Sequence, residues 1–513
     1  MKKLLCLLLA LLMLLPMVVA CKNNEQGDDT GSEGTADPNQ TDENGYNMNI
    51  LDTLPSADYD GKKFNVSMES GNDHVGNFNA TELTGVTEND TLYKWLTKVE
   101  QYYDTDIVVT ADKGSDEEYV NSVLVDLQAT DDTYHLYGVR AYQAWQIVVQ
   151  KLFLNWNSLS SEWIDLEDAQ RWDVATNEAV TFNGKFYTAT GDLGVSKLKK
   201  TMTTYYHVKL LEEYGADNGY NQDYIYGLVN EGKWTLEAME EIAKDVYFDN
   251  NDNGEDGADT YGYYSYSGNS YDIWVPAMGI TAYGEDSEGR PVAQLNKTEN
   301  ITKLEKVHDF YHLNKGVMPG TNTSVGTYAT GVGEETAFVN GNALFVTTTF
   351  ANAYDKFQVL GTEAYGMMPQ PKYDEDQDYY MSYVNDQYDV WGINANLAPG
   401  AEQDFAAHIT DALCKESSDS VYYVFYDVIL KGRYSKDKAT AEMVDKIMEN
   451  VMCDASRQFG NYLTSEGTQG YTGAVRGYLR SIDYNLGAKL SAYELALSGN
   501  NGMLNKMYEA AYQ

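Results

Sequence analysis

The sequence predicts an α/β fold with a largely parallel sheet, because strand and helix patterns alternate along its N-terminal third. Apolar residues alternate with polar ones at 64–68, which is typical of a strand, and a helical apolar stripe follows at 91–103. A second strand (106–110), a second helix (117–127) and a third strand (134–139) continue this order. Strands separated by helices pair side by side in parallel, so this region predicts one α/β lobe.

The rest of the chain is long enough for further units. The whole chain has 513 residues, which corresponds to three ordinary domains of about 150 residues each or to two large ones. Apolar residues make up 43%, which excludes wholesale disorder. Strand patterns recur at 182–190, 343–348 and 390–394, a helix is predicted at 234–246, and the chain is mostly helical from 403 onward.

The charge and the aromatic content limit the classes of partner. The formal net charge is −42, so nucleic acids and anionic membrane surfaces should be repelled. Tyrosine is abundant, with 43 residues. Its ring offers a flat apolar face and a polar tip, which suits a surface that binds sugars or peptides.

The N-terminus predicts export. Lys2 and Lys3 precede an apolar run over 4–20, which fits a secretory signal and is short for a membrane span. The run ends in Val-Val-Ala before Cys21 and resembles the lipobox of bacterial lipoproteins. That resemblance implies cleavage of residues 1–20 and lipidation of Cys21. The polar stretch that follows, in residues 21–48, is expected to be a disordered linker.

Two cysteines remain in the predicted mature chain. Cys414 and Cys453 could form a disulfide between neighbouring helices, because exported proteins meet an oxidising environment. They could equally be two separate buried thiols, since the sequence does not give their separation.

Common catalytic motifs are absent from the sequence. It contains no GxSxG elbow, no GxxxxGK[ST] phosphate loop and no GxGxxG. His308 and His312 have metal-site spacing, but the residues around them do not form HExxH, and an ordinary helix face is the better interpretation. Acid pairs are so frequent in this chain that a glycosidase dyad is neither singled out nor excluded.

Four segments together resemble one protein family. They are GKWTLEAMEEIAK at 232–244, DNNDNGEDGADTYG at 249–262, FVNGNALF at 338–345 and YGMMPQPKY at 365–373. In this order, behind a lipobox, they resemble the bacterial extracellular solute-binding proteins of the ABC-transporter sugar-binding class (family 1). The resemblance runs from about residue 62 to the C-terminus.

The resemblance implies a two-lobed periplasmic-binding-protein-like fold, with a hinge between two α/β lobes. The first lobe is expected over 49–200 plus 340–395 and the second over 201–339 plus 396–513. It also implies a lipid-anchored receptor, a monomer and not an enzyme, which binds a carbohydrate in the cleft and delivers it to an ABC permease. An oligosaccharide is favoured.

In such a fold, solute contacts come from loops at the ends of strands. In the first lobe this rule favours carboxylates after the first strand, a guanidinium and two rings after the third strand, and an acid near the first crossing between lobes. Carboxylates accept sugar hydroxyls, Arg donates a fork of hydrogen bonds, and rings stack on a sugar face. These candidates are Glu69, Asp73, Arg140, Tyr142, Trp145 and Asp192.

The second lobe contributes the densest aromatic cluster of the chain, over 263–274, where the family presents aromatic contacts. The candidates there are Tyr266, Asn269, Tyr271 and Trp274, with weaker ones at Phe350, Asn385, Asp386 and Tyr462. For each of them an ordinary core or surface role is the alternative.

The segment 249–259 starts like a calcium-binding loop. Calcium ligands are expected at positions 1, 3, 5 and 7 of such a loop, with glycine at position 6. The residues at the ligand positions are Asp249, Asn251, Asn253 and Glu255, with Asp259 as a substitute for the missing Glu at position 12. A structural calcium ion and a metal-free acidic turn are both open.

Three other functions remain as alternatives. A peptide receptor would need a fixed charge pair for the peptide termini, and the sequence does not locate one. A surface glycan-processing lipoprotein would need two carboxylates facing each other across the cleft. A purely structural surface lipoprotein would show no response to any solute.

Overall fold

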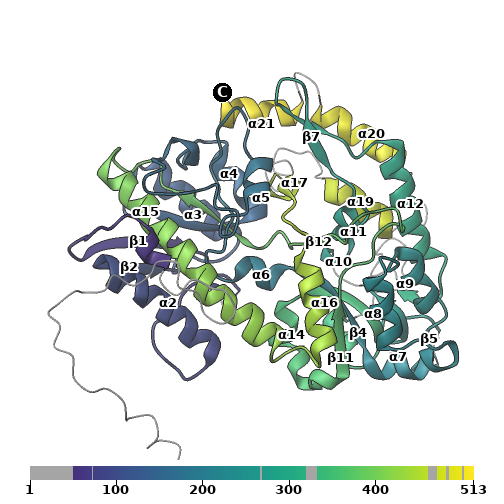
Figure 1. The fold of residues 1–513 in the computed structure, drawn as a ribbon. Coiled ribbons are helices and arrows are strands. Elements are labelled where there is room, and N and C mark those ends of the chain that lie inside the picture. Colours follow the sequence, from purple (N-terminus) through teal and green to yellow (C-terminus); the bar gives the residue numbers. More distant parts are fainter. Residues whose placement is uncertain are drawn as a thin grey trace, which may run out of the picture.

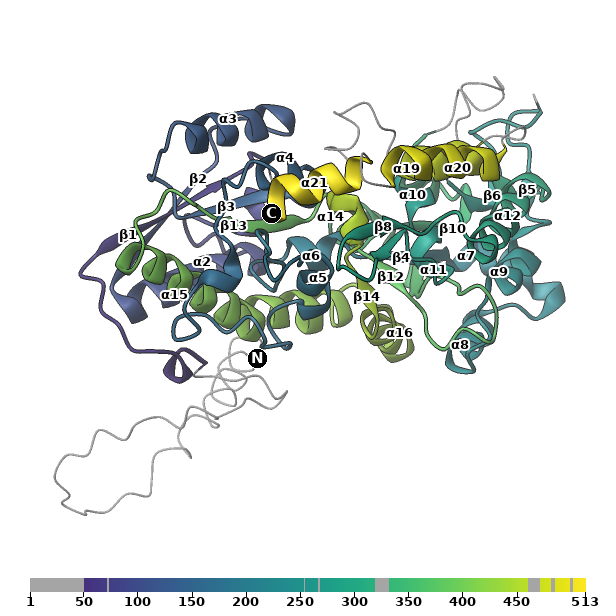
Figure 2. The ribbon, with the colours of Figure 1, turned by 90° about the horizontal axis from the view of Figure 1, so that it is seen from above.

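The computed structural model describes residues 50–71, 73–252, 254–265, 268–318, 332–459, 471–480, 485–498 and 502–513. The predicted signal peptide, Cys21 and the linker lie outside these ranges. Figure 1 shows two α/β parts joined near the middle of the molecule, and Figure 2 shows them side by side.

The first lobe contains a four-stranded sheet in the order β13-β3-β1-β2. The strands β1, β2 and β3 are parallel, and β13 runs antiparallel to β3. This arrangement confirms the β-α-β-α-β order predicted from the sequence. The strands are β1 (Lys62–Met68), β2 (Thr105–Thr110), β3 (Leu136–Arg140) and β13 (Asp389–Ile393), and the helices between the parallel strands are α2 (Thr87–Tyr103) and α3 (Glu117–Gln128).

The second lobe contains a six-stranded mixed sheet in the order β11-β4-β10-β6-β5, with β9 paired to β6. Its strands are β4 (Met202–His207), β5 (Tyr247–Phe248), β6 (Thr260–Tyr264), β9 (Val317–Met318), β10 (Ala343–Thr349) and β11 (Tyr365–Met368). Around it lie α7 (Val208–Gly215), α8 (Gln222–Asn230), α9 (Leu236–Ala243), α10 (Asn269–Asp272), α11 (Trp274–Ala277), α12 (Thr298–His312), α13 (Glu334–Val339) and α14 (Ala351–Asp355). Thr235 caps α9 as predicted, because its hydroxyl accepts a bond from the Ala238 amide at 3.2 Å.

The remaining elements pack around and between the two sheets. They are the short helices α4 (Trp145–Val148), α5 (Val174–Ala179) and α6 (Ser196–Lys200), the hairpin of β7 (Tyr283–Glu285) and β8 (Pro291–Ala293), and the pair of β12 (Ser382–Tyr383) and β14 (Val451–Met452). The C-terminal helices are α15 (Ala401–Glu416), α16 (Lys438–Met448), α17 (Ala455–Gln458), α19 (Tyr471–Arg480), α20 (Leu486–Leu497) and α21 (Met503–Tyr512). Two π-helical segments, Ser417–Tyr422 and Val424–Lys431, continue α15.

Two crossing segments meet where the lobes join. The chain leaves the first lobe through α6 into β4, and it returns through the loop between β12 and β13. Thr201 bridges Val384, and the Asn385 amide donates to the Lys200 carbonyl at 2.9 Å. The predicted two-lobed α/β fold with crossing strands at the hinge is therefore confirmed.

The sheet pairings differ from the predicted division of the chain in two places. β10 and β11 pair with β4 in the second sheet, although 340–395 was assigned to the first lobe. Of that range, β13 pairs in the first sheet. Helix α15 contacts α2 in the first lobe, although 396–513 was assigned to the second. The physical reason is that the chain crosses between lobes more often than its motifs indicate.

Two apolar clusters run through the molecule, and each contains residues of both sheets. Neighbouring strand residues project to opposite sides of a sheet, so Tyr206 and Phe345 belong to one cluster while Tyr205 and Val346 belong to the other. The lobes are thus packed against one another through continuous apolar contacts.

Cys414 and Cys453 are both buried free thiols, which answers the question that the sequence left open. Within the described ranges, no helix has both the length and the apolar character needed to cross a membrane. His308 and His312 lie on α12, where His308 stacks on Tyr478 of α19 at 4.5 Å between ring centroids, so the pair packs a helix face as predicted.

Candidate functional site

The carboxyl ends of β1 and β3 bring Glu69 and Arg140 together, because these two parallel strands are neighbours in the first sheet. Arg140 Nε donates to Glu69 Oε2 at 2.7 Å, and Arg140 Nη2 donates to Glu69 Oε1. Glu69 Oε1 also accepts the Asp116 amide at 2.7 Å, and the side chain is fully buried. The predicted direct contact of Glu69 with a solute is therefore wrong in this arrangement, and Glu69 instead orients Arg140.

Arg140 in turn belongs to a polar network that reaches solvent. Its Nη1 lies 3.4 Å from the Tyr142 hydroxyl, which donates to Asp116 Oδ1 at 2.7 Å. Gln143 Nε2 donates to the same Asp116 oxygen at 2.7 Å. We call Glu69, Asp116, Arg140, Tyr142 and Gln143 the strand-end cluster. The side chain of Asp116 is 54% exposed, so the cluster offers a carboxylate, a phenol and a guanidinium at its outer edge.

Electrostatics keep these donors protonated. Burial and the hydrogen bond to Asp116 raise the pKa of Tyr142 above its ordinary value. Burial alone would lower the pKa of Arg140, but the hydrogen bonds and charge of Glu69 outweigh it and the pKa is raised. Arg140 therefore presents a fixed donor, Tyr142 keeps its proton in the bond to Asp116, and Asp116 presents the acceptor.

Asp116 was not among the predicted residues, although a signal for it existed. It follows β2 and precedes α3, so the strand-end rule that selected Glu69 and Arg140 applies to it as well. Its backbone has φ 55° and ψ −126°, a conformation that residues other than glycine rarely adopt.

Asp73 lies in the loop after β1 and faces the second lobe. Lys200 Nζ is 3.5 Å from Asp73 Oδ2, and the Asp73 side chain is 71% exposed. Both residues line a cavity of about 330 Å³ between the first-lobe loops and α14. Across it lie Ala351 and Asp355 of α14 and Phe425 of the second π-helical segment. The predicted contact of Asp73 with a solute stays a prediction, and the structure places this side chain at the boundary between the lobes.

Asp386 lies beside the strand-end cluster but already has ionic partners. Its carbonyl accepts the Tyr142 amide at 3.2 Å, and its carboxylate pairs with Arg457. Arg457 Nη2 is also 3.1 Å from Asp272 Oδ2, and Arg476 Nε donates to Asp272 Oδ1 at 2.7 Å. Burial raises the pKa of Asp386. Arg457, Asp272 and Arg476 had no signal in the sequence, because they come from three separate helices.

Several other first-lobe and hinge candidates are core residues. Trp145 is buried, with its ring 4.6 Å from Phe459 and 5.7 Å from Tyr512. Phe350 is fully buried, and its amide donates to the Thr201 carbonyl at 2.8 Å. Asn385 is buried at the hinge. These three predictions of solute contact are wrong. The Trp145 and Phe350 side chains are packed in the apolar core, and Asn385 is buried among the hydrogen bonds of the hinge.

The aromatic candidates of the second lobe are also in the core. Trp274 is fully buried and donates through Nε1 to the Tyr311 hydroxyl at 2.9 Å. Tyr271 is fully buried, with the Arg480 guanidinium 4.8 Å from its ring centroid. Asn269 begins α10, and Tyr266 and Tyr462 lie outside the described residues. The prediction that Tyr271 and Trp274 line the cleft is wrong.

Asp192 lies apart from the strand-end cluster. Ser418 Oγ donates to it at 2.9 Å, and it lines a different cavity, of about 640 Å³, together with Asp173 and Lys197. Burial raises the pKa of Asp192 to about 6. Asp192 therefore does not join the strand-end cluster, and its contact with a solute stays a prediction.

The acidic loop after β5 has the local geometry of a tight turn. Asp249 accepts the amides of Asn251 at 3.2 Å and Gly254 at 2.9 Å, and Gly254 has φ 93°. Asp259 is fully buried and accepts the Asn250 amide and the Tyr247 hydroxyl. Glu255 is exposed, and Asn253 lies outside the described residues. Within the described part of the chain, no group of three or more His, Cys, Asp or Glu side chains is arranged to hold a metal.

Comparison with solved structures identifies the architecture. No protein-family model and no curated protein matches the sequence. The ABC substrate-binding protein Lmo0181 from Listeria monocytogenes, in complex with cycloalternan, is 13% identical, with a TM-score of 0.51 over 85% of this chain and 97% of that one. The chain has the fold of ABC-transporter solute-binding proteins.

UspC from M. tuberculosis gives the same result. It is 10% identical, with a TM-score of 0.51 over 85% of this chain and 98% of that one. At these identities the likeness extends to the solute-binding-protein fold, and the function has to be argued from the site of this chain itself.

Proposed function

We propose that this protein is an extracytoplasmic receptor that binds a carbohydrate between its lobes and delivers it to an ABC permease. The observation that carries the proposal is the strand-end cluster, a polar site at the carboxyl ends of β1 and β3 in a solute-binding-protein fold. Ligands of open α/β sheets bind at this end of the strands.

The chemistry of the cluster suits sugar hydroxyls. Arg140 Nη1 can donate and the half-exposed Asp116 can accept, whereas the Tyr142 proton is held in the bond to Asp116 and leaves its oxygen as an acceptor, so one sugar hydroxyl can receive a bond from Arg140 and donate one to Asp116. Asp73 and Lys200 add a second polar pair at the boundary with the second lobe. The binding of cycloalternan by Lmo0181 supports a saccharide as the solute, and an oligosaccharide is the preferred class.

Delivery would depend on the angle between the lobes. A solute held by the strand-end cluster and by the second lobe makes both sets of contacts only when the lobes are closed, so it favours the closed form. The hinge pairing of Thr201 with Val384 gives a pivot for that motion. A permease would then distinguish the loaded form from the empty one.

The deciding experiment is a thermal-shift screen of the chain from residue 22 onward against mono- and oligosaccharides and a peptide library, followed by calorimetry. A solute at 100 times its Kd adds about 2.7 kcal/mol to the free energy of unfolding. A selective sugar response without product formation supports the proposal. A response to peptides alone, or turnover of the sugar, would replace it with a peptide receptor or a glycan-processing enzyme. No response to either library would favour a structural role.

The cellular location is proposed from the N-terminal sequence. Cleavage before Cys21 and lipidation of its thiol would tether the folded body to the membrane on the extracytoplasmic side, as a monomer. Mass spectrometry of the N-terminal peptide from the native membrane tests this, and a Cys21→Ala variant released into the medium would agree with it. An unmodified Cys21 in the membrane fraction would contradict it.

Calcium binding by the 249–259 loop is a separate proposal. The Asp249 carboxylate is fixed by the Gly254 amide in the way a first calcium ligand is held at the start of such a loop. Calorimetric titration of the metal-stripped protein with Ca²⁺ tests it, with Asp249→Asn as the variant that should weaken binding. Absence of heat with the wild-type chain would leave an ordinary acidic turn.

A further inference from the structure

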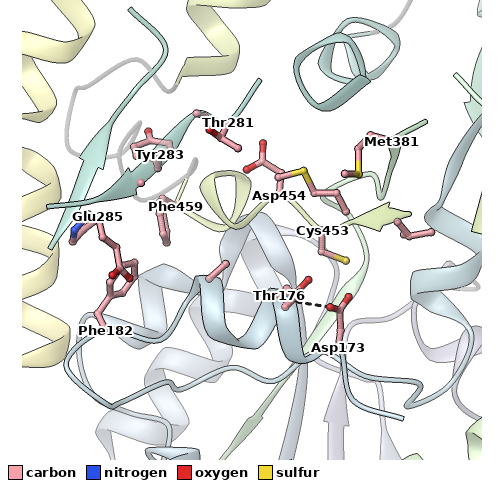
Figure 3. A pocket seen from close by; sticks show the side chains of 17 residues that line it. Asp173, Thr176, Phe182, Thr281, Tyr283, Glu285, Met381, Cys453, Asp454 and Phe459 are labelled. Carbon is pink, nitrogen blue, oxygen red and sulfur yellow. Dashed lines mark hydrogen bonds between the residues drawn. The ribbon is translucent and has the colours of Figure 1, made fainter. Parts of the chain in front are cut away.

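A second cavity lies at the join between the lobes, and no residue of the strand-end cluster is among its described lining residues (Figure 3). Its volume is about 390 Å³, within the range of about 300–1,000 Å³ typical of small-molecule sites. Helix α5, the β7–β8 hairpin and strand β14 supply its walls. None of the predicted solute residues is among its described lining residues.

The apolar part of this cavity is aromatic and sulfur-rich. Phe182, Tyr283 and Phe459 supply rings, and Met381 and Met452 supply flexible thioethers. Figure 3 shows these rings gathered on one side of the space, with Met381 across from them. Aromatic faces carry negative potential and attract cations, and thioethers adapt to the shape of an aromatic guest.

The polar part of the cavity consists of acids and hydroxyls. Asp173, Glu285 and Asp454 contribute carboxylates, and Thr176 and Thr281 contribute hydroxyls. Among its described lining residues there is no Lys or Arg. Asp173 already pairs with Lys197 at 3.0 Å, so the exposed Glu285 at the end of β7 is the carboxylate best placed to meet a cation from solvent.

The net charge of the chain also favours a cationic guest. A formal net charge of −42 concentrates cations at the surface and repels anions. An anionic guest would meet both this field and the carboxylates of the rim. A neutral apolar guest would gain the ring contacts but no charge interaction with Glu285.

We propose that the cavity between α5, the β7–β8 hairpin and β14 binds a small aromatic amine. The ring of the amine packs among Phe182, Tyr283 and Phe459, and its ammonium group faces Glu285 and the hydroxyl acceptors. Charge complementarity and the aromatic lining select this class over sugars, which need fixed donors, and over carboxylic acids. The residues that would bind the amine are not those of the strand-end cluster, so the proposal stands without the carbohydrate proposal.

The first test compares three probes of nearly equal shape. Calorimetry or saturation-transfer NMR measures the binding of 2-phenylethylamine, 2-phenylethanol and 3-phenylpropionate to the purified chain. We expect the amine to bind at least tenfold more tightly than the alcohol, with a salt-dependent affinity, and the propionate not to bind. Equal affinities for the amine and the alcohol would overturn the cationic part of the proposal, and absence of amine binding would overturn all of it.

Variants then assign the binding to this cavity. Ala179 is exposed on α5 and lines the cavity, so Ala179→Phe should fill the opening and reduce the amine affinity at least tenfold without disturbing the core. Glu178→Phe is the matched control, since it places the same ring next to Ala179 at a position that lines the cavity containing Asp192. Unchanged amine affinity in Ala179→Phe, or equal loss in Glu178→Phe, would contradict the site.

A third variant tests the charge alone. Glu285→Gln should reduce the amine affinity about threefold to tenfold and leave the alcohol affinity unchanged, because shape and packing are conserved. If both affinities stay at the wild-type value, Glu285 is not the partner of the ammonium group. A carbohydrate titration of the same variants should match the wild type, so failure at this cavity is distinguishable from failure of the proposed function.

Discussion

Residues of the strand-end cluster in the first lobe and of the aromatic segment 263–274 in the second were predicted as solute contacts, and the two regions differ in how their tyrosine hydroxyls are used. Tyr142 points its hydroxyl to the half-exposed Asp116 at the edge of the first lobe. In the second lobe, Tyr263 donates to Thr347 at 3.1 Å and Tyr264 to the Gly257 carbonyl at 2.8 Å, inside the core. Position at a strand end therefore indicates a polar edge that reaches solvent, whereas aromatic density by itself indicates a core.

The largest expected effect comes from the aromatic core. Trp274→Ala removes a fully buried ring and its hydrogen bond to Tyr311, so it should lower the free energy of unfolding by about 3–5 kcal/mol. Chemical denaturation measures the loss, and a solute titration well below the transition should give the wild-type affinity per folded molecule. A variant of wild-type stability with lost affinity would instead place Trp274 in the site.

The strand-end cluster should respond in both properties. Glu69→Ala leaves the Arg140 guanidinium, which is only 15% exposed, without its carboxylate partner. Breaking such a buried pair should cost about 3 kcal/mol of stability and release Arg140 from its fixed position. Denaturation and calorimetry with the identified solute measure the two effects. Glu69→Gln is the control, since it keeps acceptor and shape and should retain more of each; equal losses in both variants would argue against an orienting role.

The sequence located the carboxyl ends of β1 and β3 correctly. Strand and helix patterns alternate there, and this alternation predicts that β1, β2 and β3 are parallel neighbours. The sequence could not show that Glu69 is buried under Arg140 while Asp116 reaches solvent. This difference depends on a contact between two separate loops, in which the Asp116 amide donates to the Glu69 carboxylate. Sequence reasoning also missed Arg457 and Asp272, which meet only after α10 and α17 are packed. The lobe boundaries failed at β10 and β11 for the same reason: strand pairing is a long-range property.

The two lobes should also differ in their response to acid. Burial lowers the pKa of His135 and of His408 to about 4, and both lie in the first-lobe core. The folded pKa is below the unfolded value of about 6.5, so the neutral form is favoured by folding. This stability is fully present above pH 6.5 and is lost as the pH falls toward 4, by about 3 kcal/mol for each residue.

His408→Gln isolates the contribution of His408 to the acid loss. In the wild type the Tyr59 hydroxyl bonds to His408 Nδ1 at 2.6 Å, and the amide oxygen of Gln can accept the same bond without titrating. Denaturation at several pH values should show a shallower acid loss in the variant than in the wild type. Hydrogen exchange at pH 4.5 should show opening first around α15 and β1. Earlier opening of the second lobe would contradict the assignment of acid sensitivity to these histidines.

The smallest effect gives the sharpest test of the site. Tyr142→Phe removes one hydroxyl from the edge of the strand-end cluster and should reduce solute affinity about tenfold, which corresponds to about 1.4 kcal/mol, with little change in stability. Tyr102→Phe is a matched control. Its hydroxyl also donates to a carboxylate, Asp52, at 2.6 Å, on an exposed face remote from the strand ends.

If both variants bind as the wild type does, the hydroxyl at the strand ends does not contact the solute, and the binding site has to be sought elsewhere along the boundary between the lobes. If Tyr142→Phe alone loses affinity, the Tyr142 hydroxyl contributes to solute binding. The tyrosines of β6 carry the same ring and hydroxyl, but their hydroxyls bond inside the core, so position and not residue type would then explain the difference between the two regions.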